Sequence, residues 1–441
     1  MKNKFILWGL LLLGLSEPAL AVPSFARQTG QDCAACHIGS YGPQLTPYGM
    51  KFKMGGYTES DGKEGHIPIS AMLVQSFTNT KKDTTDAEPH FKTNNNASLQ
   101  EVSVFVAGRV TDNIGGFSQI TWSEPARTTS MDNFDLRFVK PMQIAGNDTI
   151  FGISLNNNPT IQDPFNTTPG WKFPYIGSEF APTPAATQII GELGTTVLGA
   201  TAYTLYDNHW YAELGGYQSF SKNMLNKMNI DPADKISGTS PYWRVAYFND
   251  MHKSAYSVGL FGLSTHILPG REAGPTDKYT DIGIDGSYQF LGTREHVMTV
   301  DGSYIHENRK LDASFASDPA IKRNGTVNRL DLSTSYHYDK TYGLTAGFFD
   351  ITGNKDGVLY EDLVADNGSR TNSPNSRGYT LQADWTPLGK ENSWGAPFAN
   401  MRLAAQYTGY TKFNGAKNNY DGFGRNASDN NTLYTSIWFA L

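Results

Sequence analysis

Cysteine is scarce in this chain. Among 441 residues only Cys33 and Cys36 occur, and they stand three apart. Exported proteins are often cross-linked by disulfides, but two cysteines in one short motif cannot staple a fold of this length. Charged residues are also few, at 18%, and the net charge of −6 gives no electrostatic basis for binding nucleic acid. After residue 21 no run approaches the roughly 18 apolar residues of a membrane-spanning helix.

The first 21 residues have the pattern of a secretory signal peptide. Lys2 and Lys4 precede an apolar run over residues 5–15, and Ala19-Leu20-Ala21 has the small residues of a cleavage site at its first and last positions. We therefore expect export and a mature chain that begins at Val22. An uncleaved N-terminal anchor is the alternative, although the apolar run is short for a membrane span.

Aromatic residues and glycine are abundant, with 23 Tyr and 44 Gly, and most of the chain alternates between apolar and polar residues. Residues 330–338, 379–386 and 282–290 show this alternation most clearly, and period two predicts β-strands. The candidate strands are 69–78, 99–111, 115–123, 132–142, 149–155, 187–194, 196–206, 210–220, 241–249, 254–265, 278–290, 294–306, 326–338, 342–351, 377–386, 399–410 and 431–441. Because bacterial barrels prefer even numbers, we expect about 16 strands, with one of these 17 segments a loop or an inward excursion.

Two all-β architectures fit this pattern. A soluble sandwich or propeller would bury the apolar face against another sheet, whereas a transmembrane barrel turns it to lipid and its polar face to a lumen. Aromatic residues near strand ends, short turns such as 112–114 alternating with long polar loops such as 79–98, and a C-terminal strand favour the barrel. We predict a transmembrane antiparallel β-barrel over residues 66–441, in contact with outer-membrane lipid.

One segment, residues 156–186, breaks the alternation. Its six prolines exclude a paired central strand. It is either a long surface loop, the ordinary expectation, or a loop folded into the lumen. Trp171, Phe173 and Tyr175 suit a fully solvated loop poorly, which keeps the second alternative open.

The chemistry of the sequence lies in residues 33–37, Cys-Ala-Ala-Cys-His, a haem c attachment motif. Cys33 and Cys36 would form two thioether bonds to the porphyrin, and His37 would bind the iron as an axial ligand. A zinc site would need further Cys or His ligands nearby, and a thioredoxin-like redox pair would need a βαβ context. One covalent haem c is therefore the predicted cofactor.

The second axial ligand is less determined by the sequence. Met54 or Met50 would raise the reduction potential relative to a second histidine. His66 and Met72 are further candidates, and an open sixth position is another alternative.

Residues 22–65 form a haem c segment that is near the size limit for folding alone. A lumen of about 16 strands is wide enough to need filling or to conduct. We therefore expect the segment to dock in or on the lumen. The polar faces of the strands would line that lumen, where Asp285, Asp331, Asp384 and His337 could attract a cation, although ordinary hydration explains them equally.

The flanks of the motif carry a resemblance. "VPSFARQTGQDCAACH" followed by "LTPYGMKFKMGGYT" resembles the fused cytochrome–porin family of the outer membrane, known from iron-oxidising Gram-negative bacteria. The resemblance implies that the haem on Cys33, Cys36 and His37 takes electrons from an extracellular donor, Fe(II) in characterised members. It implies transfer onward to a periplasmic c-type cytochrome.

The expected function is thus an outer-membrane electron conduit with an Fe(II) oxidase activity. Outward electron transfer to an extracellular acceptor is one alternative. A porin or solute channel with a structural haem plug is another, and a haem-based sensor with an open coordination site is a third.

Overall fold

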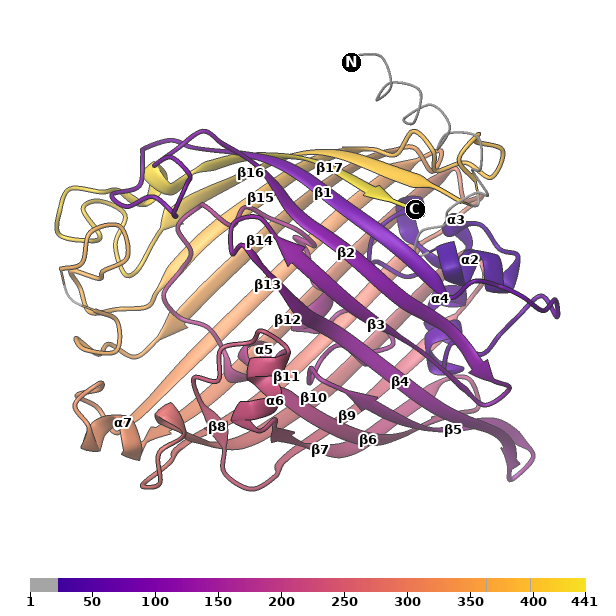
Figure 1. Ribbon diagram of the computed structural model, residues 1–441, viewed down its shortest axis with the longest axis horizontal. Helices are drawn as coiled ribbons and strands as arrows, with labels where there is room; N and C mark the ends of the chain where they lie inside the picture. Colours follow the sequence, from indigo (N-terminus) through magenta and orange to yellow (C-terminus); the bar gives the residue numbers. More distant parts are fainter. Residues whose placement is uncertain (1–22, 362, 397) are drawn as a thin grey trace, which may run out of the picture.

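The backbone of the computed structural model closes into an antiparallel β-barrel of sixteen long strands, drawn side-on in Figure 1. The structure describes residues 23–361, 363–396 and 398–441, so the signal peptide predicted for residues 1–21 lies outside it. Consecutive long strands pair along the chain. The wall closes where β1 pairs with β17, from Met72 opposite Ala440 to Thr80 opposite Thr432.

The strands of the wall are β1 (Ile69–Thr80), β2 (Asn96–Thr111), β3 (Ile114–Ser123), β4 (Thr128–Ile144), β5 (Asn147–Asn156), β6 (Val197–Tyr206), β7 (Trp210–Ser219), β9 (Ser240–Asp250), β10 (Ser254–Leu268), β11 (Asp277–Phe290), β12 (His296–Leu311), β13 (Asn324–Tyr338), β14 (Tyr342–Gly353), β15 (Ser376–Trp385), β16 (Asn400–Lys412) and β17 (Thr432–Ala440). The two-residue strand β8 (Lys235–Ile236) pairs with the end of β10. The helices are α2 (Pro23–Thr29), α3 (Cys33–Cys36), η2 (Ile38–Ser40), α4 (Pro47–Met54), η3 (Pro169–Trp171), α5 (Ile189–Glu192), α6 (Lys222–Lys227), η4 (Pro269–Arg271), α7 (Asp312–Ala316) and η5 (Ala427–Asn430).

Sixteen of the seventeen predicted strands are present, which confirms the expected barrel. The exception is 187–194, which contains the short helix α5 and is the inward excursion. It is held to the wall by hydrogen bonds that each involve a side chain, and not by a backbone ladder. The Ile190 amide donates to Asp281 Oδ2 at 2.9 Å, and Gln188 Nε2 donates to the Ile305 carbonyl at 2.9 Å.

The wall has an apolar outer face and a polar inner face, as the alternation predicts. Ile284, Leu332 and Leu381 are exposed on the outside by 47%, 47% and 49%. Asp285 and Asp384 lie on two of the same strands but point to the opposite face. They are only 3% and 6% exposed because they face a filled lumen. An outer belt of this kind is stable only against lipid, so the soluble alternatives are excluded.

The described part of the chain contains no helix with both the length and the hydropathy needed to cross a bilayer.

The two ends of the barrel differ. Short turns such as 112–113 and 339–341 lie at one end, and longer loops such as 81–95 and 354–375 at the other. Bacterial barrels have short periplasmic turns and longer extracellular loops, so the short-turn end faces the periplasm. Helices α2, α3 and α4 gather at that end (Figure 1).

The proline-rich stretch does not form the surface loop that we took as its ordinary expectation. Residues 157–196, called the inner segment below, run through the lumen, where Asp163, Phe165 and Thr168 are at most 2% exposed. Its polar groups are satisfied by the inner wall. Gln100 Nε2 donates to the Gly177 carbonyl at 2.9 Å, and Gln406 Nε2 donates to the Ile176 carbonyl at 3.1 Å.

A charge on the outer belt should destabilise the barrel. We expect Leu332→Arg, near the middle of β13, to lower the free energy of unfolding by about 2–4 kcal/mol, because the guanidinium would enter hydrocarbon. Urea unfolding in lipid vesicles measures this, with Leu332→Phe as the apolar control. Equal stability of the two variants would mean that this face does not contact lipid.

Candidate functional site

The haem motif forms one turn of helix, α3, at the periplasmic mouth of the barrel. Asp32 caps the turn, since its Oδ1 accepts a hydrogen bond from the Ala35 amide at 2.9 Å. The His37 amide donates to the Cys33 carbonyl at 2.9 Å, and the chain then leaves the helix in an extended conformation. This turn brings Cys33, Cys36 and His37 together, and their role in holding a haem stays a prediction.

Helix α4 packs directly on the motif. A Cβ at Gly49 would lie 2.3 Å from the Cys36 carbonyl oxygen, so the two backbones touch at a position where no side chain fits. The Thr46 amide donates to the same carbonyl at 2.9 Å, and Thr46 also caps α4. The motif is therefore held from within residues 23–57, which we call the plug.

The barrel wall holds the plug mainly through the backbone carbonyls that follow the motif. Asn400 Nδ2 donates to the Ser40 carbonyl, and Arg402 Nη2 donates to the Tyr41 carbonyl, each at 2.7 Å. From other strands, Gln289 Nε2 donates to the Leu45 carbonyl at 2.7 Å, and Tyr203 Oη donates to the Met54 carbonyl at 2.8 Å.

Side chains of the plug bond to the wall as well. Gln44 Nε2 donates to Thr299 Oγ1 at 2.7 Å and to Asp301 Oδ2 at 2.8 Å. The Gly39 backbone lies against the His337 ring, since a Cβ there would be 2.3 Å from His337 Cδ2. With these contacts the plug touches β6, β11, β12, β13 and β16, so the expected docking in the lumen mouth is what the structure shows for this polypeptide segment.

The methionines proposed as second axial ligands are buried in an apolar cluster. Met50 and Met54 are 2% and 0% exposed. They pack with Leu45 of the plug, Phe165 of the inner segment and wall residues that include Tyr203. A role of either sulfur at iron stays a prediction.

The other two candidates for the sixth position lie elsewhere. His66 Nε2 is 2.9 Å from Asp61 Oδ1, and Met72 packs on β1 with Val74 and Phe105. Both therefore have structural partners of their own.

Plug and inner segment are bonded to each other. Lys53 Nζ donates to the Ile161 carbonyl at 2.7 Å and to Asn166 Oδ1 at 2.8 Å. Asn166 Nδ2 in turn donates to the Pro43 carbonyl at 2.6 Å. The two segments that enter the lumen thus form one connected filling.

The lumen carboxylates have cationic partners in the protein. Arg244 Nη2 lies 2.7 Å from Asp285 Oδ2 and 3.2 Å from Asp163 Oδ1, and all three side chains are almost fully buried. Asp331 pairs with Lys172 and with Arg329, both at 2.8 Å. Because Asp285 and Asp331 are neutralised internally, they are poor sites for attracting a cation.

The motif offers the groups that a covalent haem c requires, two unbonded thiols and an imidazole. Cys33 and Cys36 form no disulfide, and burial raises the pKa of Cys36 to about 12. Protonated thiols are unlike the thiolate of a redox-active CxxC pair. Burial lowers the pKa of His37 to about 4, so its ring is neutral at pH 7.

Within the described ranges, no group of three or more His, Cys, Asp or Glu side chains is arranged to hold a metal ion. The zinc alternative thus has no ligand set there.

Sequence reasoning missed the arginines of the wall that hold the plug and the inner segment. Arg137, Arg244 and Arg402 all occupy inward positions of predicted strands and are at most 4% exposed. Their parity along the strands would have placed them in the lumen. Apart from Asp135, which pairs with Arg137 two residues away on β4, their partners are carbonyls and carboxylates distant in sequence, for which the chain carries no local signal.

A side chain at the contact between α3 and α4 should loosen the plug. We expect Gly49→Ala to cost about 1–3 kcal/mol, since a backbone must move to admit the Cβ. Hydrogen–deuterium exchange over residues 23–57 should then rise. Gly274→Ala is the control, because a Cβ there meets no atom within 4 Å. Unchanged exchange in Gly49→Ala would contradict the tight packing.

No protein-family model matches the chain, and no curated protein does. Similar solved structures include an anion-selective porin from Comamonas acidovorans, with 12% identity over 84% of this chain and 98% of that one and a TM-score of 0.46. Others are Salmonella typhi OmpF in complex with daunomycin (9%, 85% and 97%, TM-score 0.47) and the outer membrane channel DcaP of Acinetobacter baumannii (10%, 85% and 96%, TM-score 0.47). At these values the likeness carries no functional argument. The closed wall, its lipid-facing belt and its two unlike ends make this chain an outer-membrane β-barrel protein of porin-like architecture from a Gram-negative bacterium.

Proposed function

We propose that this protein is an outer-membrane electron conduit, in which one haem c on Cys33, Cys36 and His37 exchanges electrons at the periplasmic mouth of the barrel. The observation that carries the proposal is the position of the motif. It belongs to a plug that wall strands hold in that mouth, beside a lumen crossed by the inner segment. The resemblance to the fused cytochrome–porin family points the same way.

The residues of the chain divide the work of holding such a cofactor. Cys33 and Cys36, one helical turn apart, offer two thiols for thioether bonds, and His37 offers a neutral imidazole. Asn400 and Arg402 fix the backbone just after His37 by binding the Ser40 and Tyr41 carbonyls. Haem c, when bound, supplies one-electron exchange between ferrous and ferric iron.

The barrel supplies insulation and access. Charged donors do not cross hydrocarbon, whereas a group seated in the wall's opening can meet partners in water. We propose inward flow, from an extracellular donor such as Fe(II) to a periplasmic c-type cytochrome, which would make the protein an Fe(II) oxidase. Outward electron transfer would use the same haem position in the opposite direction.

A solute channel with a structural plug is the second candidate, and it is the one closest to the established architecture because it requires only the barrel. A hollow of about 410 Å³ beside the inner segment favours it. Phe173, Phe349 and Tyr410 are among the lining residues, so this space would suit an apolar or aromatic solute.

Anaerobic mixing of the purified protein with Fe(II) tests the conduit. We expect rapid reduction of the haem, followed by its absorbance, with dithionite defining the total reducible haem. Cys36→Ala removes one thioether and should lower the amount of covalent haem, while Ala34→Ser in the same helical turn should not.

Two results would count against this proposal. Reduction by dithionite but not by Fe(II) would remove Fe(II) as the donor. A full-length protein isolated from a host competent in cytochrome c maturation, yet without covalent haem, would remove the conduit itself.

Conductance in planar bilayers separates the two candidates. We expect the wild-type protein to conduct poorly, because plug and inner segment fill the lumen. Asn400→Ala/Arg402→Ala, which frees the plug's carbonyls, should conduct more, and Lys140→Ala on the outer face should match the wild type. Large, steady wild-type pores would favour the solute channel.

A further inference from the structure

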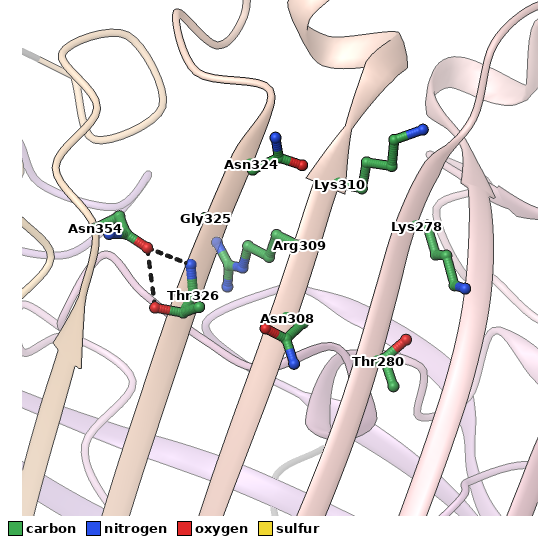
Figure 2. Close-up of a pocket in the computed structure, with 9 residues that line it drawn as sticks. All are labelled: Lys278, Thr280, Asn308, Arg309, Lys310, Asn324, Gly325, Thr326 and Asn354. Carbon is green, nitrogen blue, oxygen red and sulfur yellow. Dashed lines mark hydrogen bonds between the residues drawn. The ribbon is translucent and has the colours of Figure 1, made fainter.

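A polar hollow of about 520 Å³ lies on the outer wall of the barrel, near the extracellular end (Figure 2). Strands β11, β12 and β13 form it side by side. The outward-facing residues that line it are Lys278, Thr280, Asn308, Lys310, Asn324 and Thr326. Arg309, Gly325 and Asn354 complete the lining, and none of the lining residues belongs to the plug or the haem motif.

The hollow sits directly beyond the lipid-facing belt. On β11 the same outward parity runs from Lys278 and Thr280 to Ile282 and Ile284, which are 51% and 47% exposed. The outer face thus changes from apolar to basic within a few residues along one strand. At the extracellular end, that change marks the level of the lipid headgroups in the outer leaflet.

Two lysines lie on neighbouring strands at this hollow, with their ammonium ends directed apart (Figure 2). Lys278 of β11 and Lys310 of β12 are directly opposite in the strand register, an arrangement that like charges make unfavourable unless an anion lies between them. Lys278 forms no ion pair with any residue that the structure describes. Lys310 Nζ pairs with Asp312 Oδ2 at 2.8 Å, but Asp312 also lies 3.7 Å from Arg323. The cluster is therefore positively charged.

Polar side chains beside the lysines add further hydrogen-bond donors. Asn324 is opposite Lys310 on the next strand, and Asn308 is opposite both Thr280 and Thr326. Thr326 is fixed by Asn354, whose Oδ1 accepts from its amide at 2.6 Å and its hydroxyl at 2.9 Å (Figure 2). Two ammonium groups with amide donors beside them suit a phosphate, which accepts several charge-assisted hydrogen bonds.

We propose that this hollow binds a phosphate group of a phosphorylated glycolipid in the outer leaflet. Lys278 and Lys310 hold the phosphate, and Asn308 and Asn324 donate hydrogen bonds to it. The acyl chains lie along the belt that begins at Ile282. A lipid is favoured over a free phosphate because the hollow opens at headgroup level and continues into an apolar surface.

Native mass spectrometry and thermal unfolding of the full-length protein in detergent test the site, with diphosphoryl lipid A as the probe. We expect bound lipid A and a raised Tm for the wild type. For Lys278→Ala/Lys310→Ala we expect the affinity for lipid A to fall by about tenfold or more, since two charge-assisted contacts are lost. Lys140→Ala, an outward lysine near the periplasmic rim, should bind as the wild type does.

Two further arms identify the ligand. Dephosphorylated lipid A should bind the wild type no better than it binds the double variant, and inorganic phosphate alone should not raise the Tm. Equal binding of dephosphorylated lipid A would overturn the phosphate contact. A lysine-dependent Tm shift with inorganic phosphate alone would overturn the lipid as ligand. Unchanged lipid A affinity in the double variant, with its Tm intact, would overturn the site.

Discussion

Every backbone N–H and C=O group that enters hydrocarbon must find a partner within the protein, and this requirement shapes the whole molecule. The pairing of β1 with β17 meets it, because it leaves the wall without a free edge. Closure creates an enclosed interior that is polar, since the apolar side chains are committed to lipid. Everything that fills this interior must therefore be held by polar contacts.

The lumen is packed by a different chemistry from that of an ordinary protein core. Long polar side chains of the wall reach backbone carbonyls of the two entering segments, as Arg402 reaches Tyr41 and Arg137 reaches Lys53. Buried charges are paired, as Arg244 is with Asp285. Such pairs contribute little net stability when intact, but the loss of one partner leaves an uncompensated charge. The plug and the inner segment are thus fixed in one position in the lumen, because a shift would leave these charges unpaired.

Much of the wall could be predicted from the sequence, because period two encodes which face meets lipid. It correctly placed Asp285 and Asp384 inside and Ile284 outside. It also predicted that one of the seventeen segments would not be a wall strand, but it did not identify that segment as 187–194. The course of the inner segment could not be predicted, because its prolines exclude a strand but do not say where the chain goes. The Cys-Ala-Ala-Cys-His motif at 33–37 was readable from the sequence, and its attachment to haem stays a prediction.

The wall residues that hold this motif in place could not be predicted from the sequence. The bond from Asn400 to the Ser40 carbonyl joins residues 360 positions apart, and a carbonyl accepts in the same way whatever side chain it carries. Local patterns therefore give no sign of which wall residues meet the plug. Only the closed barrel brings β16 over the start of the chain.

The attachment of the plug at the periplasmic mouth has a consequence for how the molecule is built. An exported chain reaches the periplasm first, so its leading residues arrive on the side where they finally rest and need no threading through the cylinder. The seat on Asn400 and Arg402, however, exists only after β16 has joined the wall. The earliest part of the chain to emerge is thus among the last to be fixed, and the final strands lock it in place.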